Sequence, residues 1–403
     1  MTFKKISLLL CISGLVLCAC SRDFYYESPS MDGAESLKGG TPDAPPGEGG
    51  GQSEGTPGKI TAGEWNDLDN WAFWSRLMTS TQSDQEAGDY TKMPEYWRFY
   101  TDRRVAVEVK SANGDPLNGV SVELRSDGET IWKSVTDCFG RADGWIGLYD
   151  KEAQAGTLSI SLNGAVQEAE PIVTGWKDTY TINQYVIDAT APESVADILF
   201  IVDATGSMSD EIAFLKADLL NIIETVKKME TATKIRTAAL FYRDERDDYL
   251  TRVSPFSPDF SVTSSFISGQ EAGGGGDYPE AVHTALETSL QELAWSSSAQ
   301  AKLAFMLLDA PPHQDVQGVI ESIQKSIRTY AAQGIKLIPV ASSGVDKNTE
   351  FILRFMAIAT GGTYVFITND SGIGNEHIAA SVGEYKVEIL GDLMVRLITK
   401  YVG

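Results

Sequence analysis

The chain has 403 residues, of which 42% are hydrophobic, and it carries a formal net charge of −23 at pH 7. This length and composition can fill more than one hydrophobic core, so we expect two or more domains. Nucleic acid and anionic lipid surfaces are disfavoured as partners, because they carry charge of the same sign. The acidity also suits divalent cations, although a solvated acidic surface explains most of it.

Residues 1–20 have the pattern of an export signal. Lys4 and Lys5 precede a short apolar stretch, and Leu17-Cys18-Ala19-Cys20 follows. The apolar stretch is too short for a membrane span and is typical of a cleaved signal. The last four residues resemble the lipobox of bacterial lipoproteins, which implies cleavage before Cys20 and acylation of that cysteine. An ordinary cysteine-rich signal peptide is the alternative.

The lipobox resemblance implies a lipid-anchored protein of the bacterial envelope. Ser21 stands where many enterobacterial lipoproteins of the inner membrane have an aspartate, so we expect the outer membrane, on a face that the sequence leaves open. No later apolar run reaches the roughly 18 residues of a spanning helix, so lipid is the expected tether. Cys138 would be the only thiol left in the mature chain, which predicts no intrachain disulfide.

Residues 21–63 are rich in glycine and proline and predict a flexible stalk. Residues 64–100 are crowded with aromatic side chains, and two interpretations compete. The favoured one is a docking segment whose aromatic residues pack on the next domain, and the other is an exposed aromatic platform for a ligand. The composition leaves both open.

Residues 101–190 alternate apolar and polar side chains, with glycine turns at short intervals such as Asn113-Gly114 and Asp127-Gly128. This pattern predicts a small all-β domain. The valine strands and glycine turns resemble the carboxypeptidase regulatory-like β-sandwich family, which implies a structural module. We expect no chemistry in this part of the chain.

Residues 195–403 alternate short apolar strands with amphipathic helices, which predicts an α/β domain with a doubly wound, mostly parallel sheet. The expected strands cover 197–203, 235–242, 302–309, 335–341 and 363–368, with an antiparallel edge near 249–255. The expected helices cover 209–230, 279–294, 315–333, 348–360 and 384–402.

Three predicted loops at the carboxyl ends of strands carry oxygen ligands. They contain Asp203, Thr205 and Ser207 in the first loop, Asp277 in the second and Asp309 in the third. Open α/β sheets bind their ligands at this edge, so the side chains should converge. A set made only of oxygen ligands suits a hard divalent cation such as Mg²⁺ or Mn²⁺.

Together these loops resemble those of the von Willebrand factor type A family, whose adhesion-type (MIDAS) metal site uses Asp-x-Ser/Thr-x-Ser, a second-loop ligand and a third-loop aspartate. The resemblance implies that Thr205 and Ser207 ligate the ion directly, while Asp203 and Asp309 act directly or through water. Asp277 stands where integrin-like members have threonine. Three carboxylates around one Mg²⁺ leave a local charge of −1, so metal retention is expected to be more secure than capture of an acidic partner.

Other residues near these loops have competing interpretations. Asp244 is expected to hydrogen-bond a metal-bound water, or else to be a surface turn residue with Arg243. His313 is expected at a rim or surface position, and His283 packed or solvent-facing on a helix. Gly273–Gly276 lack the Gly-Lys-Ser/Thr of a P-loop, so a loop that passes close to the ion is favoured over phosphate binding.

Three classes of function remain. The leading one is a binding or adhesion protein that engages a protein or glycan through the metal. The second is an envelope assembly scaffold in which the metal is structural. A metal-dependent phosphatase is disfavoured, because Thr205 stands where the Asp-x-Asp pattern needs a general acid. We therefore expect no catalytic residues and no enzyme activity.

Overall fold

The computed structural model describes residues 56, 58–80, 90–373 and 378–402. The export signal, Cys20 and the predicted stalk up to residue 55 lie outside the described residues. Within these ranges, every helix is too short or too polar to cross a membrane.

The α/β part is built on an eight-stranded sheet with the order β11-β10-β9-β12-β13-β14-β1-β15. The five strands from β10 to β14 in this order are parallel, and β11 pairs antiparallel at the edge. The strands are β9 (Glu193–Asp203), β10 (Lys234–Tyr242), β11 (Thr251–Ser257), β12 (Ala299–Leu308), β13 (Lys336–Ala341) and β14 (Tyr364–Ile367). The expected doubly wound α/β fold is confirmed here.

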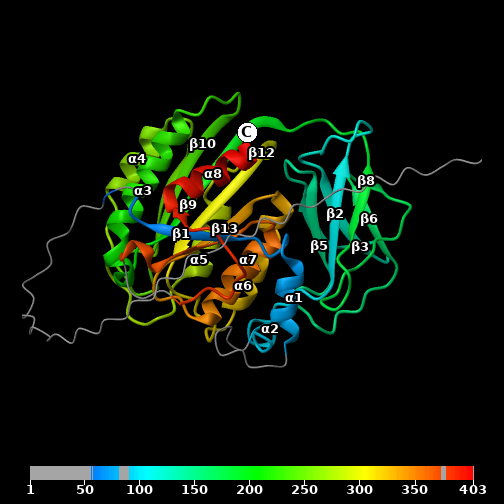
Figure 1. Cartoon of the computed structure of the whole chain (residues 1–403), viewed down its shortest axis with the longest axis horizontal. Coiled ribbons are helices and arrows are strands. Elements are labelled where there is room, and N and C mark those ends of the chain that lie inside the picture. Colours follow the sequence, from blue (N-terminus) through cyan, green and yellow to red (C-terminus); the bar gives the residue numbers. More distant parts are fainter. Residues whose placement is uncertain (1–55, 57, 81–89, 374–377, 403) are drawn as a thin grey trace, which may run out of the picture. The chain divides into compact units, whose positions relative to one another are not determined.

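Helices cover both faces of this sheet (Figure 1). One face packs against α3 (Ser209–Lys227), α4 (Phe260–Ser268) and α8 (Leu390–Val402), and the other against α5 (Val282–Gln291), α6 (Val319–Gln333) and α7 (Lys347–Thr360). A strand covered on both faces needs a continuous apolar run, which is why residues 198–202 are all apolar and all buried.

The end of the predicted stalk needs a correction, because residues 61–63 belong to a strand. This strand, β1 (Thr61–Trp65), lies between β14 and the two-residue strand β15 (Glu388–Ile389) and is antiparallel to both. Ala62 is fully buried, and a Cβ on Gly63 would lie 2.6 Å from the Phe366 ring. The sequence predicts a linker here because the small residues do not alternate between apolar and polar side chains. The apolar contacts of this strand come from the neighbouring strands of the sheet.

The aromatic residues that follow point inward. Helices α1 (Trp71–Thr79) and α2 (Met93–Trp97) bury Trp74 and Trp97 completely, and the Trp74 ring stacks on Phe351 of α7. Tyr96 is the exception, with 54% of its surface exposed. The described part of this segment therefore packs on the α/β core and does not form an aromatic platform.

A fully buried ion pair fastens this segment to α7. Arg354 donates from Nε and Nη2 to the two carboxylate oxygens of Asp67, over 2.9 and 2.6 Å, and from Nη1 to the Ser381 carbonyl. Its guanidinium also lies over the Trp74 ring, and Asp67 accepts from the indole of Trp65. The two hydrogen bonds from the guanidinium to the carboxylate offset the cost of burying both charges.

Residues 101–190 form two sheets, one with the order β5-β2-β8 and the other with the order β4-β3-β6-β7. The strands are β2 (Arg104–Lys110), β3 (Ser121–Ser126), β4 (Glu129–Val135), β5 (Arg141–Trp145), β6 (Leu158–Leu162), β7 (Ala165–Val166) and β8 (Ile182–Val186). The predicted turns are present, with Gly114 and Gly128 at φ of 88° and 84°. The resemblance to the carboxypeptidase regulatory-like family stays a prediction.

The Asp67–Arg354 pair predicts a strong asymmetry between buried and exposed ion pairs. Asp67→Ala removes two hydrogen bonds from a buried guanidinium, which keeps only the more distant Glu350 carboxylate at 3.5 Å, and it should lower the free energy of unfolding by about 3 kcal/mol. The control is Glu321→Ala, which removes an exposed pair with Arg98 and should cost under about 1 kcal/mol. Urea unfolding of both variants measures the difference, and equal costs would contradict the role assigned to Asp67.

Candidate metal site

The candidate site lies where the chain changes direction across the sheet. From β9 the chain goes to β10 on one side and returns to β12 on the other, so the carboxyl ends of β9 and β12 form the switch point. Leu307 is paired with Val202, which brings Asp309 and Asp203 to neighbouring positions just beyond this pair. Open α/β sheets place their ligands at such a point.

The first loop is ordered by its own hydrogen bonds. Oδ1 of the buried Asp203 accepts from the backbone N–H of Thr205 over 2.9 Å and from its hydroxyl over 2.7 Å. The Thr205 hydroxyl lies 3.1 Å from that of Ser207, whose residue is exposed. The three oxygens therefore run from the buried strand end to the surface.

Asp203 and Asp309 are buried carboxyls of the same charge. Burial and then the charge of Asp309 raise the pKa of Asp203 to about 7. Burial also raises the pKa of Asp309, an effect that a hydrogen bond from Ser207 partly offsets. In the described part of the chain, Oδ2 of Asp203 and Oδ1 of Asp309 are buried with no hydrogen-bond partner. The buried hydroxyl of Tyr242 on β10 also interacts with Asp203 and offsets part of the rise in its pKa.

The glycine-rich loop passes directly against the first loop. The Gly274 carbonyl accepts from the Gly206 N–H over 3.1 Å, and the Ala204 carbonyl accepts from the Gly273 N–H over 3.0 Å. Gly275 has a φ of 70°, and a Cβ there would lie 3.3 Å from that of Thr205. The glycines are needed for this close approach, since a side chain would strain the backbone and crowd the site.

The second loop brings a different carboxyl group inward from the one predicted. Asp277 is exposed, whereas Glu280 is 2% exposed and its Oε2 is buried without a hydrogen-bond partner among the described residues. Its backbone N–H donates to the Pro311 carbonyl of the third loop over 2.9 Å. Burial, with Asp203 as the next contribution, raises the pKa of Glu280 to about 9. The assumption that Asp277 adds its charge close to the ion is therefore not supported by its position.

Sequence reasoning missed Glu280 because acidic residues near the start of a helix are common, and one sequence shows no reason to bury this one. The available signal was its place next to Pro279, directly before α5. A short parallel bridge between Glu280 and Pro312 turns it toward the third loop. Its burial is decided by that tertiary pairing.

Asp244 and His313 form a buried pair beside the site. Nε2 of His313 lies 2.6 Å from Oδ1 of Asp244, and both residues are less than 10% exposed. The sequence predicts a rim or surface position for His313, and its burial contradicts the surface alternative, since the pairing with Asp244 draws the ring inside. Arg243 donates to the carbonyls of Ala204 and Glu271, so it braces the first loop. His283 is half-buried on α5.

These residues fit a divalent cation held by mixed oxygen ligands. No three His, Cys, Asp or Glu side chains of the described ranges gather closely enough to hold a metal alone. The candidate ligands are instead the carboxylates of Asp203 and Asp309 and the hydroxyls of Thr205 and Ser207. The buried oxygens without partners on both aspartates are what a cation would satisfy, and hard oxygens favour Mg²⁺ or Mn²⁺.

The fold and these loops define an α/β domain with an acidic site at the carboxyl edge of its sheet. Residues 197–369, which include all three loops, match the family model of the von Willebrand factor A domain. The match supports the predicted resemblance for this part of the chain.

Two curated proteins are similar to the chain. An ariadne-like RING finger protein of Acanthamoeba polyphaga mimivirus is 27% identical over 194 residues, which is 44% of this chain and 19% of that protein. The alpha-protein kinase vwkA of Dictyostelium discoideum is 32% identical over 119 residues, which is 29% of this chain and 19% of the kinase. The chain spans about a fifth of the length of these relatives.

The raised pKa values predict how the metal-free protein responds to pH. An acid whose pKa is raised by folding contributes stability below its unfolded pKa, and that contribution is lost as the pH rises through the folded pKa. In EDTA, stability should therefore fall from about pH 4 to about pH 7 through Asp203, and on toward about pH 9 through Glu280. Stabilisation by Mg²⁺ should grow over the same range. Urea unfolding at several pH values measures both, and a stability in EDTA that rises with pH contradicts the prediction.

The sequence predicts Asp277 as the second-loop carboxyl group near the ion, whereas the structure buries Glu280 there. Substituting each residue in turn tests which of the two affects metal binding. Glu280→Gln replaces a buried carboxyl group beside the ion, and it should weaken Mg²⁺ binding by about fivefold or more above about pH 9, where this carboxyl group is ionised. Asp277→Asn removes an exposed, screened charge and should change it by less than about twofold. Isothermal titration with Mg²⁺ compares the variants. The reverse order would restore Asp277 as the second-loop group.

Proposed function

We propose that this chain is an envelope-anchored binding protein that engages a protein or glycan partner through a divalent metal site. The observation that carries the proposal is the graded burial of the candidate ligands. Asp203 and Thr205 are fully buried, Asp309 is 5% exposed, and the Ser207 residue is exposed. An ion held by these residues would be bound by buried oxygens on its inner side, and a partner could reach it from the solvent side.

The residues have distinct roles in this proposal. Thr205 and Ser207 would ligate the ion through their hydroxyls, with Asp203 and Asp309 acting directly or through water. When bound, Mg²⁺ or Mn²⁺ supplies an electrophilic centre that takes an oxygen from the partner. Asp277 is exposed, so solvent would screen its charge, and the local charge of −1 expected with Asp277 near the ion stays a prediction. At neutral pH, where a pKa of about 9 keeps Glu280 protonated, the charges of the two aspartates would balance that of the ion.

Anchoring and location rest on the sequence of residues 1–21. Acylation of Cys20 would tether the chain to the bacterial outer membrane, with lipid as the only membrane contact. The acidic composition supports a partner other than nucleic acid. The partner would then be a protein or glycan on the same side of the membrane as the metal site.

The contacts between the loops favour binding over a bracing role for the ion. Backbone hydrogen bonds already join the first loop to the glycine-rich loop and Glu280 to the third loop. A purely structural ion would duplicate these connections. We also propose no catalytic role, because the Thr205 hydroxyl donates to Asp203 and His313 is held by Asp244.

A metal titration tests the proposed site. Asp203→Asn and Asp309→Asn should each weaken Mg²⁺ or Mn²⁺ binding by more than about 100-fold, since each removes a charge that faces the ion. The matched control is Asp277→Asn, which removes an exposed aspartate of the second loop and should leave metal binding unchanged. Isothermal titration and Mn²⁺ electron paramagnetic resonance measure this directly. If Asp203→Asn and Asp309→Asn both bind the metal normally, the proposal is wrong.

A second measurement separates binding from scaffolding. Purified outer-membrane proteins and envelope glycans are immobilised, and the soluble chain is passed over them in Mg²⁺ or in EDTA. A metal-dependent binding protein releases its partner in EDTA, and Asp309→Asn fails to bind it in Mg²⁺. A scaffold with a structural ion keeps its partner in both cases, provided that circular dichroism shows it still folded.

A further inference from the structure

The eight-stranded sheet has a free edge at β15. In the described part of the chain, β15 is the last strand of the order and pairs on one side only, with β1. Thr61 is opposite Ile389, and Ala62 is opposite Glu388. A strand at a sheet edge presents backbone N–H and C=O groups on its outer side, and these groups can pair with a further strand.

The backbone groups of Val387 and Ile389 point to this outer side. The Leu390 N–H donates to the Ile60 carbonyl over 2.8 Å, which continues the register of β1 and β15 by one residue. Along an antiparallel strand, residues that bond the neighbouring strand alternate with residues whose backbone groups point away from it. Because Glu388 and Leu390 face β1, the N–H and C=O groups of Val387 and Ile389 are directed at a partner strand.

Exposed apolar side chains accompany these backbone groups. Tyr385, Val387 and Ile389 are 44%, 43% and 39% exposed. The Tyr385 ring packs edge-on against Phe366 of β14, with 4.8 Å between the ring centres, and Phe366 belongs to the core on the α7 side of the sheet. Side chains alternate between the two faces of a strand, so all three lie on this side. They extend the apolar surface of the sheet to its edge.

The α8 side of the same edge carries charges. Arg396 of α8 is shared by two carboxylates, and it lies 2.9 Å from Glu64 and 3.1 Å from Glu388. Lys386 is on the same side, but its Nζ is 3.9 Å from the Glu388 carboxylate and its side chain is 80% exposed. One guanidinium thus serves two carboxylates, while the lysine stands mainly in solvent.

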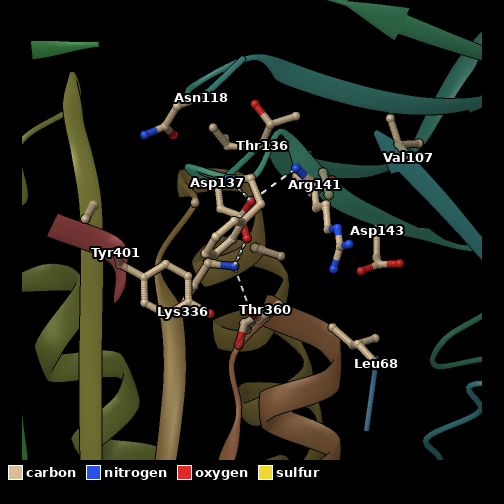
Figure 2. A pocket seen from close by; sticks show the side chains of 18 of the residues that line it. Leu68, Val107, Asn118, Thr136, Asp137, Arg141, Asp143, Lys336, Thr360 and Tyr401 are labelled. Carbon is tan, nitrogen blue, oxygen red and sulfur yellow. Dashed lines mark hydrogen bonds and ion pairs between the residues drawn. The ribbon is translucent and has the colours of Figure 1, made fainter. Parts of the chain in front are cut away.

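The charges at the amino end of the sheet are arranged differently. A cavity of about 360 Å³ lies there, between the sheet and the β region (Figure 2). Its wall has more cations than carboxylates: the cations are Arg104, Arg141, Lys302, Lys336 and Lys400, and the carboxylates are Asp69, Asp137 and Asp143. Each carboxylate has its own cation within 3.2 Å, and Figure 2 shows the contact of Lys336 with Asp137. These carboxylates are satisfied within the chain, unlike the pair that shares Arg396.

The sequence of the free edge is complementary to itself. Residues 385–389 are Tyr-Lys-Val-Glu-Ile, so opposite charges flank Val387. When two copies run antiparallel with Val387 opposite Val387, Lys386 of each copy is opposite Glu388 of the other, and Tyr385 is opposite Ile389. Opposite residues share a face with their Cβ atoms about 4.5–5.5 Å apart, and both kinds of pair stabilise a sheet. A slide by two residues would place like charges opposite each other, so this register is favoured.

We propose that two copies of this chain associate through this edge, with residues 385–389 antiparallel about a two-fold axis at Val387. The outward groups of the two Val387 residues exchange two hydrogen bonds across the axis. The two eight-stranded sheets become one continuous sheet. The axis satisfies both edges at once, because the same surface serves both copies. Strands β13, β14 and β1 separate this edge from β12, so the contact does not depend on the metal site.

Analytical ultracentrifugation of the full soluble chain tests for the dimer. A five-residue edge is small compared with the roughly 1,200 Å² that a stable complex buries, so concentrations up to about 1 mM are needed. We expect a dimer that forms as the concentration rises. The metal-site variant Asp309→Asn should dimerise equally well, so a failed metal site leaves this result readable.

Charge reversal tests the proposed register. Lys386→Glu and Glu388→Lys each replace two pairs of opposite charge with two pairs of like charge, and each should weaken dimerisation by about tenfold or more. An equimolar mixture of the two variants should dimerise again, because every cross-pair then joins a lysine to a glutamate. The matched control is Lys177→Glu, which reverses an exposed lysine of the β region and should dimerise like the unaltered chain.

A backbone variant tests the hydrogen bonds of the edge. Val387→Pro removes an N–H that points away from β1, so the sheet of each copy stays intact while the dimer loses two bonds and should also weaken by about tenfold or more. Circular dichroism checks the fold of every variant. If Glu388→Lys fails to fold because it leaves Arg396, Lys386→Glu and Val387→Pro still decide the result.

Weaker association of these variants, with normal association of Lys177→Glu, supports the proposal. It is overturned if the chain stays monomeric up to about 1 mM, or if Lys386→Glu and Val387→Pro dimerise like the control, which would place the contact on another surface. A monomer in which the Val387 and Ile389 amide hydrogens exchange slowly would show that another segment occupies the edge, and this outcome also overturns the proposal.

Discussion

The structure depends on the burial of carboxyl groups at the carboxyl edge of the sheet. Asp203, Glu280 and Asp309 come from three loops. Burial raises the pKa of each of them, and neighbouring carboxyl groups raise those of Asp203 and Glu280 further. Charges of the same sign in a dry site are costly, so the site is stable only with protons or with a cation. This constraint links sheet topology to chemistry, because the adjacency of β9 and β12 is what brings the first and third loops together.

The same core contains the opposite solution to the problem of buried charge. Arg354 is matched by Asp67 with two short hydrogen bonds, so no ligand is required there. The pair also explains why the segment before the β region belongs to the α/β core. With β1 inserted in the sheet and Trp74 stacked on Phe351, the N-terminal described residues complete the hydrophobic layer over α7. Charge satisfaction and apolar burial reinforce each other at this contact.

The two ends of the sheet differ in electrostatic character. The carboxyl edge concentrates acidic groups against glycine-rich backbone, whereas the amino edge faces a cavity with excess cations. Strand β12 runs between them, with Lys302 near its start and Asp309 just after its end.

The sequence by itself determined the parallel α/β architecture and the first and third loops. Runs such as residues 198–202 are apolar over their whole length, and this pattern has few solutions other than a strand covered on both faces. Asp203 and Asp309 were predictable because each directly follows such a run. The positions of these loops need only the order of the strands.

The tertiary structure decided everything that depends on contacts between distant segments. Strand β1 has no alternating pattern of its own and exists through pairing with β14 and β15. Glu280 rather than Asp277 turns inward because it forms a backbone bridge with Pro312. His313 is buried because its ring pairs with the Asp244 carboxyl group. In each case a residue of ordinary local preference is placed by a partner far along the chain. One sequence holds no record of such a pairing, since its energy appears only when both segments are packed.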